Sequence, residues 1–169
     1  MKKTIAGLCL SIMMPIQLAL GVEQSLSLRI DSPTREFNDP DQFVLSIEIQ
    51  NMSGETCVVF PAYLRRNFLP IEGQGAQFVA YPGPVINPWP TALLLNAGER
   101  KTVTLSGVEK QGEGVWKLER GSYNLSVSLH VAPTSTFGVE NPGEEFRNKP
   151  VWRGSVESNS ITIRYLDQK

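Results

Sequence analysis

Two residue types that build many active sites are scarce in this chain. Its 169 residues include one histidine, His130, and two cysteines, Cys9 and Cys57. Cys9 lies in an apolar N-terminal segment, residues 1–21, that we expect to be removed as a leader. Only Cys57 would then remain, and no disulfide within the chain could form. Because Cys57 begins the apolar run CVVF, we expect a buried thiol rather than one paired with a partner. With so few histidine and cysteine ligands, a zinc or copper site is not expected.

Clustered positive charge is missing as well. Lysine and arginine number 16 against 17 acidic residues, a net charge of −1. The acidic excess grows if Lys2 and Lys3 are removed with the leader. Nucleic acid and anionic membranes are therefore not expected as partners, since both require concentrated positive charge. No cofactor is expected either, and after the leader no apolar run is long enough to cross a membrane.

The first residues have the pattern of a secretory signal. Lys2 and Lys3 precede a mostly apolar run over residues 4–20, and the small residues of Ala19-Leu20-Gly21 follow. This pattern predicts a signal peptide over residues 1–21, cleaved after Gly21, and one domain over residues 22–169. A retained membrane anchor is the alternative, but the run is short and is interrupted by Pro15 and Gln17. We expect an exported protein, either periplasmic or secreted.

The remaining chain alternates apolar and polar residues with period two, and no stretch of ten or more residues has the apolar stripe of a helix. The clearest segments are SLSLRI, FVLSIEIQ, KTVTLSG, SYNLSVSLHV and SITIRYL, with CVVF, AQFVAY and TALLL as shorter ones. Strands of this kind with turn residues between them predict an all-β sandwich or barrel. Three connections, over residues 61–75, 82–90 and 132–150, are long enough to suggest functional loops.

Tyr123 indicates which kind of sandwich this is. It follows Gly121 and stands two residues before Leu125, at the start of the most regular strand. This is the spacing of the tyrosine corner in immunoglobulin-like sandwiches, where the phenol packs inward and its hydroxyl bonds upstream backbone. Antibody domains have a cysteine where this chain has Leu125. We therefore expect an immunoglobulin-like antiparallel β-sandwich of about seven to nine strands without a disulfide.

The same strand argues against a catalytic histidine. If Tyr123 and Leu125 face inward, then Asn124, Ser126, Ser128 and His130 face outward together. Neighbouring side chains on one strand face stand parallel, about 7 Å apart. A base and its nucleophile usually come from different segments. We therefore interpret this face as solvated.

The order of these motifs resembles bacterial immunoglobulin-like domains of the intracellular proteinase-inhibitor type. The motifs are LSIEIQN with a following Ser and Gly, VVF, L-AGE--TV-L and L--GSYNLSV-L; the ending VWRGSVESNSITI is similar to that of exported bacterial sandwich proteins of unknown role. The resemblance covers residues 24–166. It implies an immunoglobulin-like fold and a non-enzymatic role, with proteinase inhibition as one possibility. The signal peptide departs from an intracellular family, and no reactive-loop motif can be transferred.

One loop has the oxygen ligands that calcium prefers. Asp31, Asp39 and Asp41 lie within residues 31–41. Their spacing matches no EF-hand loop, so turn formation by aspartate side chains is the favoured interpretation and calcium the weaker one.

Recognition by loops is the remaining hypothesis. Trp89 lies among four prolines in residues 82–90, where it either binds a partner or caps the core. Phe137 and Phe146 lie in the connection over residues 132–150, whose place corresponds to a recognition loop of the fold. We expect Trp152 to be structural. The sequence thus favours an exported binding or structural module whose partner is a protein or a cell-envelope component; a proteinase inhibitor, or a hydrolase using loop carboxylates, are the alternatives.

Overall fold

The computed structural model describes residues 25–71, 75–80, 92–107, 110–111, 114–132, 144–146 and 148–166. Within these residues the secondary structure consists of β-strands and three short 3₁₀ helices. The strands are β1 (Leu26–Asp31), β2 (Glu36–Phe37), β3 (Val44–Asn51), β4 (Cys57–Val59), β5 (Leu64–Pro70), β6 (Ala76–Ala80), β7 (Leu93–Leu95), β8 (Arg100–Ser106), β9 (Lys110–Gln111), β10 (Gly114–Leu118), β11 (Gly121–Val131), β12 (Gly154–Glu157) and β13 (Ile161–Tyr165). The 3₁₀ helices are η1 (Pro40–Gln42), η2 (Pro61–Tyr63) and η3 (Glu144–Phe146). The all-β class is confirmed. The described strands are more numerous than the expected seven to nine, because several strands of only two or three residues are also present.

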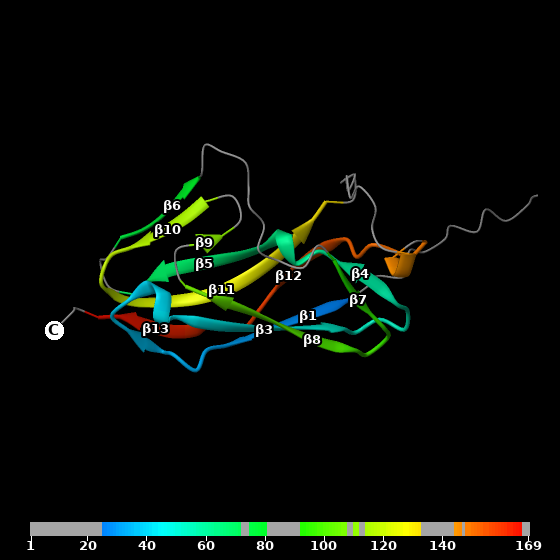
Figure 1. Ribbon diagram of the computed structural model, residues 1–169, viewed down its shortest axis with the longest axis horizontal. Coiled ribbons are helices and arrows are strands. Elements are labelled where there is room, and N and C mark those ends of the chain that lie inside the picture. The colour runs from blue at the N-terminus through cyan, green and yellow to red at the C-terminus, as the bar shows by residue number, and fades with distance from the viewer. Residues whose placement is uncertain are drawn as a thin grey trace, which may run out of the picture.

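The strands form two main layers (Figure 1). One is the antiparallel sheet β1-β3-β8. In the other, β5 pairs along one side of β11, while β12 and then β13 pair along its other side. An immunoglobulin sandwich places its strands A, B and E in one sheet and C, F and G in the other. The observed pairing is compatible with that arrangement.

A short parallel pair joins β2 to β13 at the edge of the second sheet. The backbone N–H of Arg164 donates to the carbonyl of Arg35 at 2.7 Å, and that of Leu166 donates to the carbonyl of Phe37 at 2.8 Å. The Phe37 ring stacks on Tyr165 with centroids 5.4 Å apart. An early segment of the chain and its last described strand thus run side by side in the same direction.

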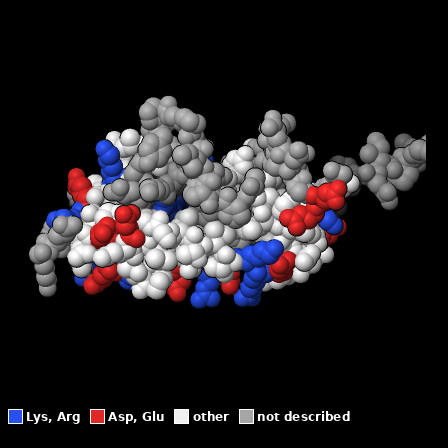
Figure 2. Space-filling view, in the orientation of Figure 1, with Lys and Arg blue, Asp and Glu red and all other residues white. Residues whose placement is uncertain are grey.

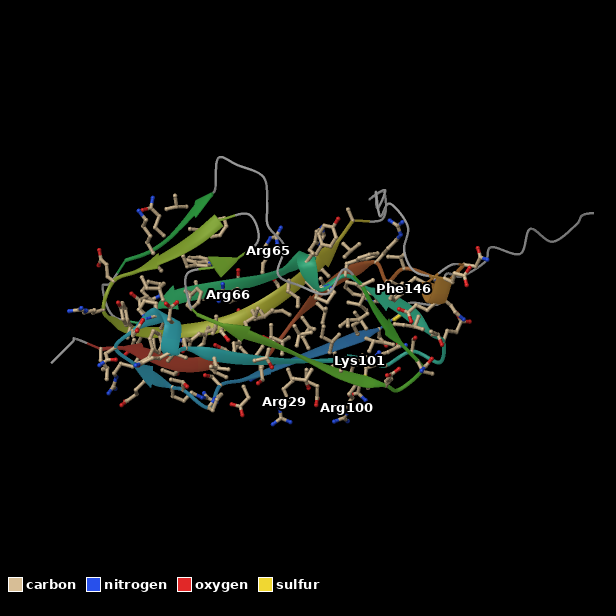
Figure 3. The ribbon with its side chains drawn as sticks, viewed as in Figure 1. Arg29, Arg65, Arg66, Arg100, Lys101 and Phe146 are labelled. Atoms are coloured by element: carbon tan, nitrogen blue, oxygen red, sulfur yellow. The ribbon has the colours of Figure 1, made fainter. Side chains whose placement is uncertain are left out.

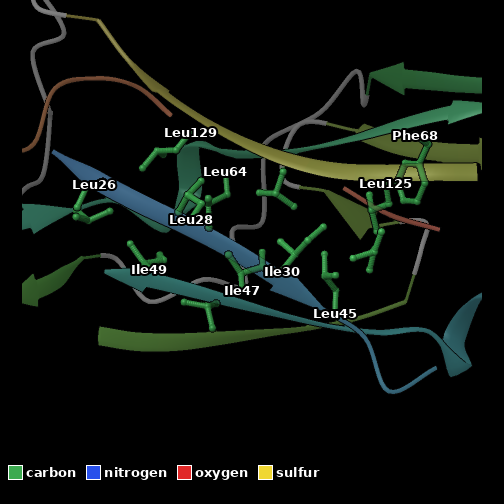
Figure 4. Packing of buried hydrophobic residues seen from close by; sticks show 14 of the residues in the cluster. Leu26, Leu28, Ile30, Leu45, Ile47, Ile49, Leu64, Phe68, Leu125 and Leu129 are labelled. Carbon is green, nitrogen blue, oxygen red and sulfur yellow. The ribbon is translucent and has the colours of Figure 1, made fainter. Parts of the chain in front are cut away.

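The core lies between the layers and is built from the alternate residues of the long strands (Figure 4). The inward-facing residues of β1, β3 and β11 are Leu26, Leu28, Ile30, Leu45, Ile47, Ile49, Tyr123, Leu125, Val127, Leu129 and Val131. Burying a side chain of this size contributes about 1.5–3 kcal/mol. The period-two pattern of the sequence therefore identified the side of each strand that forms the core.

Residues 61–75 were expected to form a loop, and this prediction was wrong for residues 64–70. Residues 64–70 form β5, which pairs antiparallel with β11. The alternation was hidden because Arg66 occupies an inward position between Leu64 and Phe68 and is only 2% exposed. Its Nη1 donates to the carbonyl of Gly107 at 2.7 Å, and burial lowers the pKa of its guanidinium to about 10. A buried arginine, which is rare, thus made a core strand look like a loop.

β6 and β10 extend β5 and β11 beyond a bend, and β9 pairs with β10 to complete a small three-stranded sheet that we call the arm. The arm leaves the body at one end of the molecule (Figure 1). Trp116 packs between Phe68 of β5 and Phe78 of β6, with ring centroids 5.1 and 5.6 Å away. These ring contacts attach the arm to the sandwich.

Tyr123 fixes the bend. Its ring is fully buried, and its hydroxyl donates to the carbonyl of Glu119 and, at 3.1 Å, to that of Gly75. This is the geometry expected of a tyrosine corner. Burial, together with the charge of Glu119, raises the pKa of the phenol. Leu125, two residues later, is also fully buried.

Cys57 opens β4 as a free, buried thiol, and no disulfide is present in the described part of the chain. Burial raises its pKa to about 11. The thiol is therefore protonated at neutral pH and contributes as a small apolar side chain.

Candidate binding surface at the loop end

Three connections between strands of the two sheets meet at one end of the sandwich, opposite the arm. We call this region the loop end; its described residues are 52–63, 92–99, 144–146 and 148–153 (Figure 1). It includes β4, β7, η2 and η3. The described segments are far apart in sequence, so the sandwich brings them together.

Hydrogen bonds tie the three connections into one unit. β4 pairs antiparallel with β7 along one side. On its other side the N–H of Val58 donates to the carbonyl of Pro150 at 2.9 Å, and the N–H of Trp152 donates to the carbonyl of Val58 at 2.9 Å. A short strand paired on both sides cannot move independently of its neighbours. The loop end therefore has a rigid base.

The fully buried Asn51 organises the same region from beneath. Its Nδ2 donates to the carbonyls of Glu55 at 2.6 Å and of Leu95 and Asn96 at 3.1 Å each. Its Oδ1 accepts from the N–H and the hydroxyl of Ser53, at 3.0 and 2.7 Å. One amide thus joins the turn after β3 to the end of β7. This role was not predicted from the sequence, although asparagine followed two residues later by serine is a turn signal.

The outer surface of the loop end combines aromatic and acidic groups. Phe146 is partly exposed at the end of η3, where Glu144 and Glu145 are both exposed. Tyr63, in η2, is 37% exposed and contacts the buried Phe60 edge-on, with centroids 6.5 Å apart. Partly exposed aromatic rings on a rigid base are typical of recognition surfaces.

The predicted binding residues are not all in the described part of the chain. Trp89 and Phe137 lie outside it. Phe146 projects at the end of the molecule away from the arm (Figure 3). Trp152 is 3% exposed, and its ring lies against Gly154, where a Cβ would come within 3.3 Å of Cζ2. Trp152 is thus part of the packed base.

Two of the three aspartates considered for calcium, Asp31 and Asp39, have other partners. Asp31 accepts from the N–H of Ser32 at 2.8 Å and forms an ion pair with Arg35, and these hydrogen bonds lower the pKa of its carboxyl. Asp39 accepts from the N–H of Asp41 at 3.0 Å and caps η1. Among the described residues no group of three or more acidic, histidine or cysteine side chains is placed to hold a metal ion. The backbone contacts of Asp31 and Asp39 are those of ordinary turns.

The polar face of β11 is less solvated than expected. Asn124 and His130 are exposed and Ser128 is half-buried, but Ser126 is only 8% exposed. Ser126 Oγ donates to Glu157 Oε1 at 2.9 Å, and Ser128 Oγ accepts from an amide on β5. The prediction of a solvated face was therefore wrong for Ser126, because neighbouring strands contribute polar side chains that cover it.

Comparisons with known proteins leave the family open. No protein-family model matches the chain, and neither a curated protein nor a solved structure is significantly similar to it. None of the helices in the described residues is long and apolar enough to cross a membrane.

Proposed function

We propose that the protein is an exported, non-enzymatic binding module that recognises a protein or envelope component through its loop end. The observation that supports this proposal is the joining of three connections into one hydrogen-bonded base. A rigid base lowers the entropy lost on binding, so that few exposed groups suffice for affinity. The proposal keeps an immunoglobulin-like relationship, with proteinase inhibition as the alternative implied by that resemblance.

Phe146 is the residue on which the proposal depends most. It is carried by η3, a short helix within the connection between β11 and β12. The adjacent carboxylates of Glu144 and Glu145 give this surface negative charge (Figure 2). A ring flanked by carboxylates suits a partner that presents an apolar pocket bordered by lysine or arginine, since such charges steer association.

The test is cross-linking and pull-down from the native cell envelope with three forms of the protein. These are the wild type, Phe146→Ala, and the control Leu69→Ala, which truncates an exposed apolar side chain of β5 away from the loop end. We expect a saturable partner that is retained by Leu69→Ala and lost or weakened about tenfold or more by Phe146→Ala, as for an interface hot spot. Equal recovery with both variants would remove Phe146 from the interface. Inhibition of purified proteases at micromolar concentration would instead support the inhibitor alternative.

A further inference from the structure

The two edges of the sheet β1-β3-β8 differ in what lies beside them (Figure 1). At the β1 edge, the side-chain amide of Asn159 lies against the backbone of Ile30. Asn159 Oδ1 accepts from the N–H of Ile30 at 2.8 Å, and Asn159 Nδ2 donates to the carbonyl of Ile30 at 3.1 Å. Asn159 thus takes the place of a neighbouring strand, and a further strand could not pair along β1 without displacing it.

The β8 edge has no such cover in the described part of the chain. Glu99 and Gly107, which flank β8, both bond towards β3 through their backbone. Because backbone groups alternate in direction along an antiparallel strand, those of Thr102 and Thr104 at the centre of β8 point away from β3. No described residue outside β3 pairs with them. β8 therefore presents free N–H and carbonyl groups along this edge.

An open strand edge is a template for another strand, and proteins usually restrict it with charged residues. β8 has charge at one end only, where Figure 3 shows Arg100 and Lys101. Lys101 Nζ donates to the carbonyl of Leu94 at 2.8 Å. Near the uncharged end, the inward-facing Leu105 is half-buried, although Leu45 directly opposite it on β3 is fully buried. A strand that fits this edge has its own charge at the opposite end.

We propose that two copies of the protein form a dimer by antiparallel pairing of β8 with the β8 of the second copy. With Val103 on the two-fold axis, all seven residues of β8 are paired. Thr102 then exchanges backbone hydrogen bonds with Thr104 of the second copy, and their side chains form a favourable cross-strand pair. Lys101 lies opposite Leu105 of the second copy, and its aliphatic stem covers the half-buried leucine.

This register also keeps the positive charges apart. Arg100 lies opposite Ser106 of the second copy, and the two Arg100 residues are six residue steps, about 20 Å, apart along the strands. That separation exceeds the Debye length of about 8 Å at physiological ionic strength. Parallel pairing in register would instead place each Arg100 and each Lys101 beside its own counterpart, which is unfavourable. The charge pattern therefore selects the antiparallel arrangement.

The dimer closes on itself. Because Asn159 occupies the β1 edge, each copy has one open edge in this sheet, and pairing through a two-fold axis uses it completely. Antiparallel pairing places the two loop ends, which adjoin Arg100, at opposite ends of the dimer. The contact is one strand long, so we expect a weak dimer with a Kd on the order of 100 μM.

The test is sedimentation velocity of the purified protein, from about one-tenth of the expected Kd to about ten times that value. The wild type should change from monomer to dimer over this range. Amide hydrogen exchange at Thr102 and Thr104 should slow as the concentration rises, because their N–H groups become bonded.

Two double variants that share Thr102→Lys test the register, since positions 102 and 104 are both exposed. Adding Thr104→Lys sets lysines of the two copies opposite each other and should raise the Kd about tenfold or more. Adding Thr104→Glu sets each lysine opposite a glutamate and should give a Kd no higher than that of the wild type. Thr162→Lys, at an exposed position of the other sheet, should leave the Kd unchanged.

The proposal fails if the wild type remains a monomer at about ten times the expected Kd. It fails also if the lysine–lysine and lysine–glutamate variants have the same Kd. A dimer in which exchange at Thr102 and Thr104 is independent of concentration would place the interface on another surface and overturn it as well. These results are independent of the pull-down, because the two experiments share no variant.

Discussion

Replacing Asn51 with alanine should destabilise the protein more than any surface substitution. The change removes three donated and two accepted hydrogen bonds in a side chain that is fully buried. The carbonyls of Glu55 and Leu95 and the N–H of Ser53 would lose this partner. An unsatisfied buried group costs about 1–3 kcal/mol. Allowing for partial relaxation of the turn, we expect a loss of about 3–5 kcal/mol in the free energy of unfolding.

That loss is large compared with a typical stability of about 5–15 kcal/mol. For a domain of about 150 residues it corresponds to a fall in Tm of roughly 10 °C. Urea unfolding should be followed by tryptophan fluorescence, since the buried Trp152 lies in the affected region. Asn124→Ala is the matched control: its Oδ1 accepts one hydrogen bond from Thr162 at the surface, at 3.2 Å. A destabilisation by Asn51→Ala within about 0.5 kcal/mol of that control would refute the reasoning.

Three further predictions concern single residues. Tyr123→Phe removes the hydroxyl bonded to two carbonyls at the bend and should cost about 1–2 kcal/mol in thermal or urea unfolding, while an unchanged midpoint would contradict its role. Cys57 should react with a thiol reagent only after unfolding, because its pKa is about 11 and it is buried; rapid reaction of the native protein at pH 7–8 would count against this. Gly154→Ala should lower the Tm more than Gly98→Ala. Both glycines have positive φ (139° and 75°), but only at Gly154 would the added Cβ lie within 3.3 Å of a ring, that of Trp152. Equal effects of the two substitutions would exclude contact with the Trp152 ring as the cause.

The fold could be predicted where the strand pattern is set by the core. β1, β3, β8, β11 and β13 each alternate because one face is buried and the other is not. β5 could not be recognised in this way, since Arg66 stands at a core position and its guanidinium bonds to a group that only the folded chain brings near, the carbonyl of Gly107. A local pattern cannot reveal a distant acceptor.

The candidate surfaces were predictable only in part. The connection carrying Phe146 was predicted as a candidate surface because immunoglobulin-like folds place recognition loops there. The bonding of Val58 to Pro150 depends on a contact between distant segments, and no local signal indicates it.

The parallel pairing of β2 with β13 determines how the protein would respond to mechanical load. If tension were applied between the chain before β2 and the chain after β13, the two strands would be pulled in opposite directions along their length. Their hydrogen bonds would then be sheared together instead of being opened one after another, as they would be if the strands were peeled apart from one end. The Phe37–Tyr165 stack lies beside these bonds and would have to slide at the same step. Under such a load this short pair would act as a clamp that resists the separation of β2 from β13.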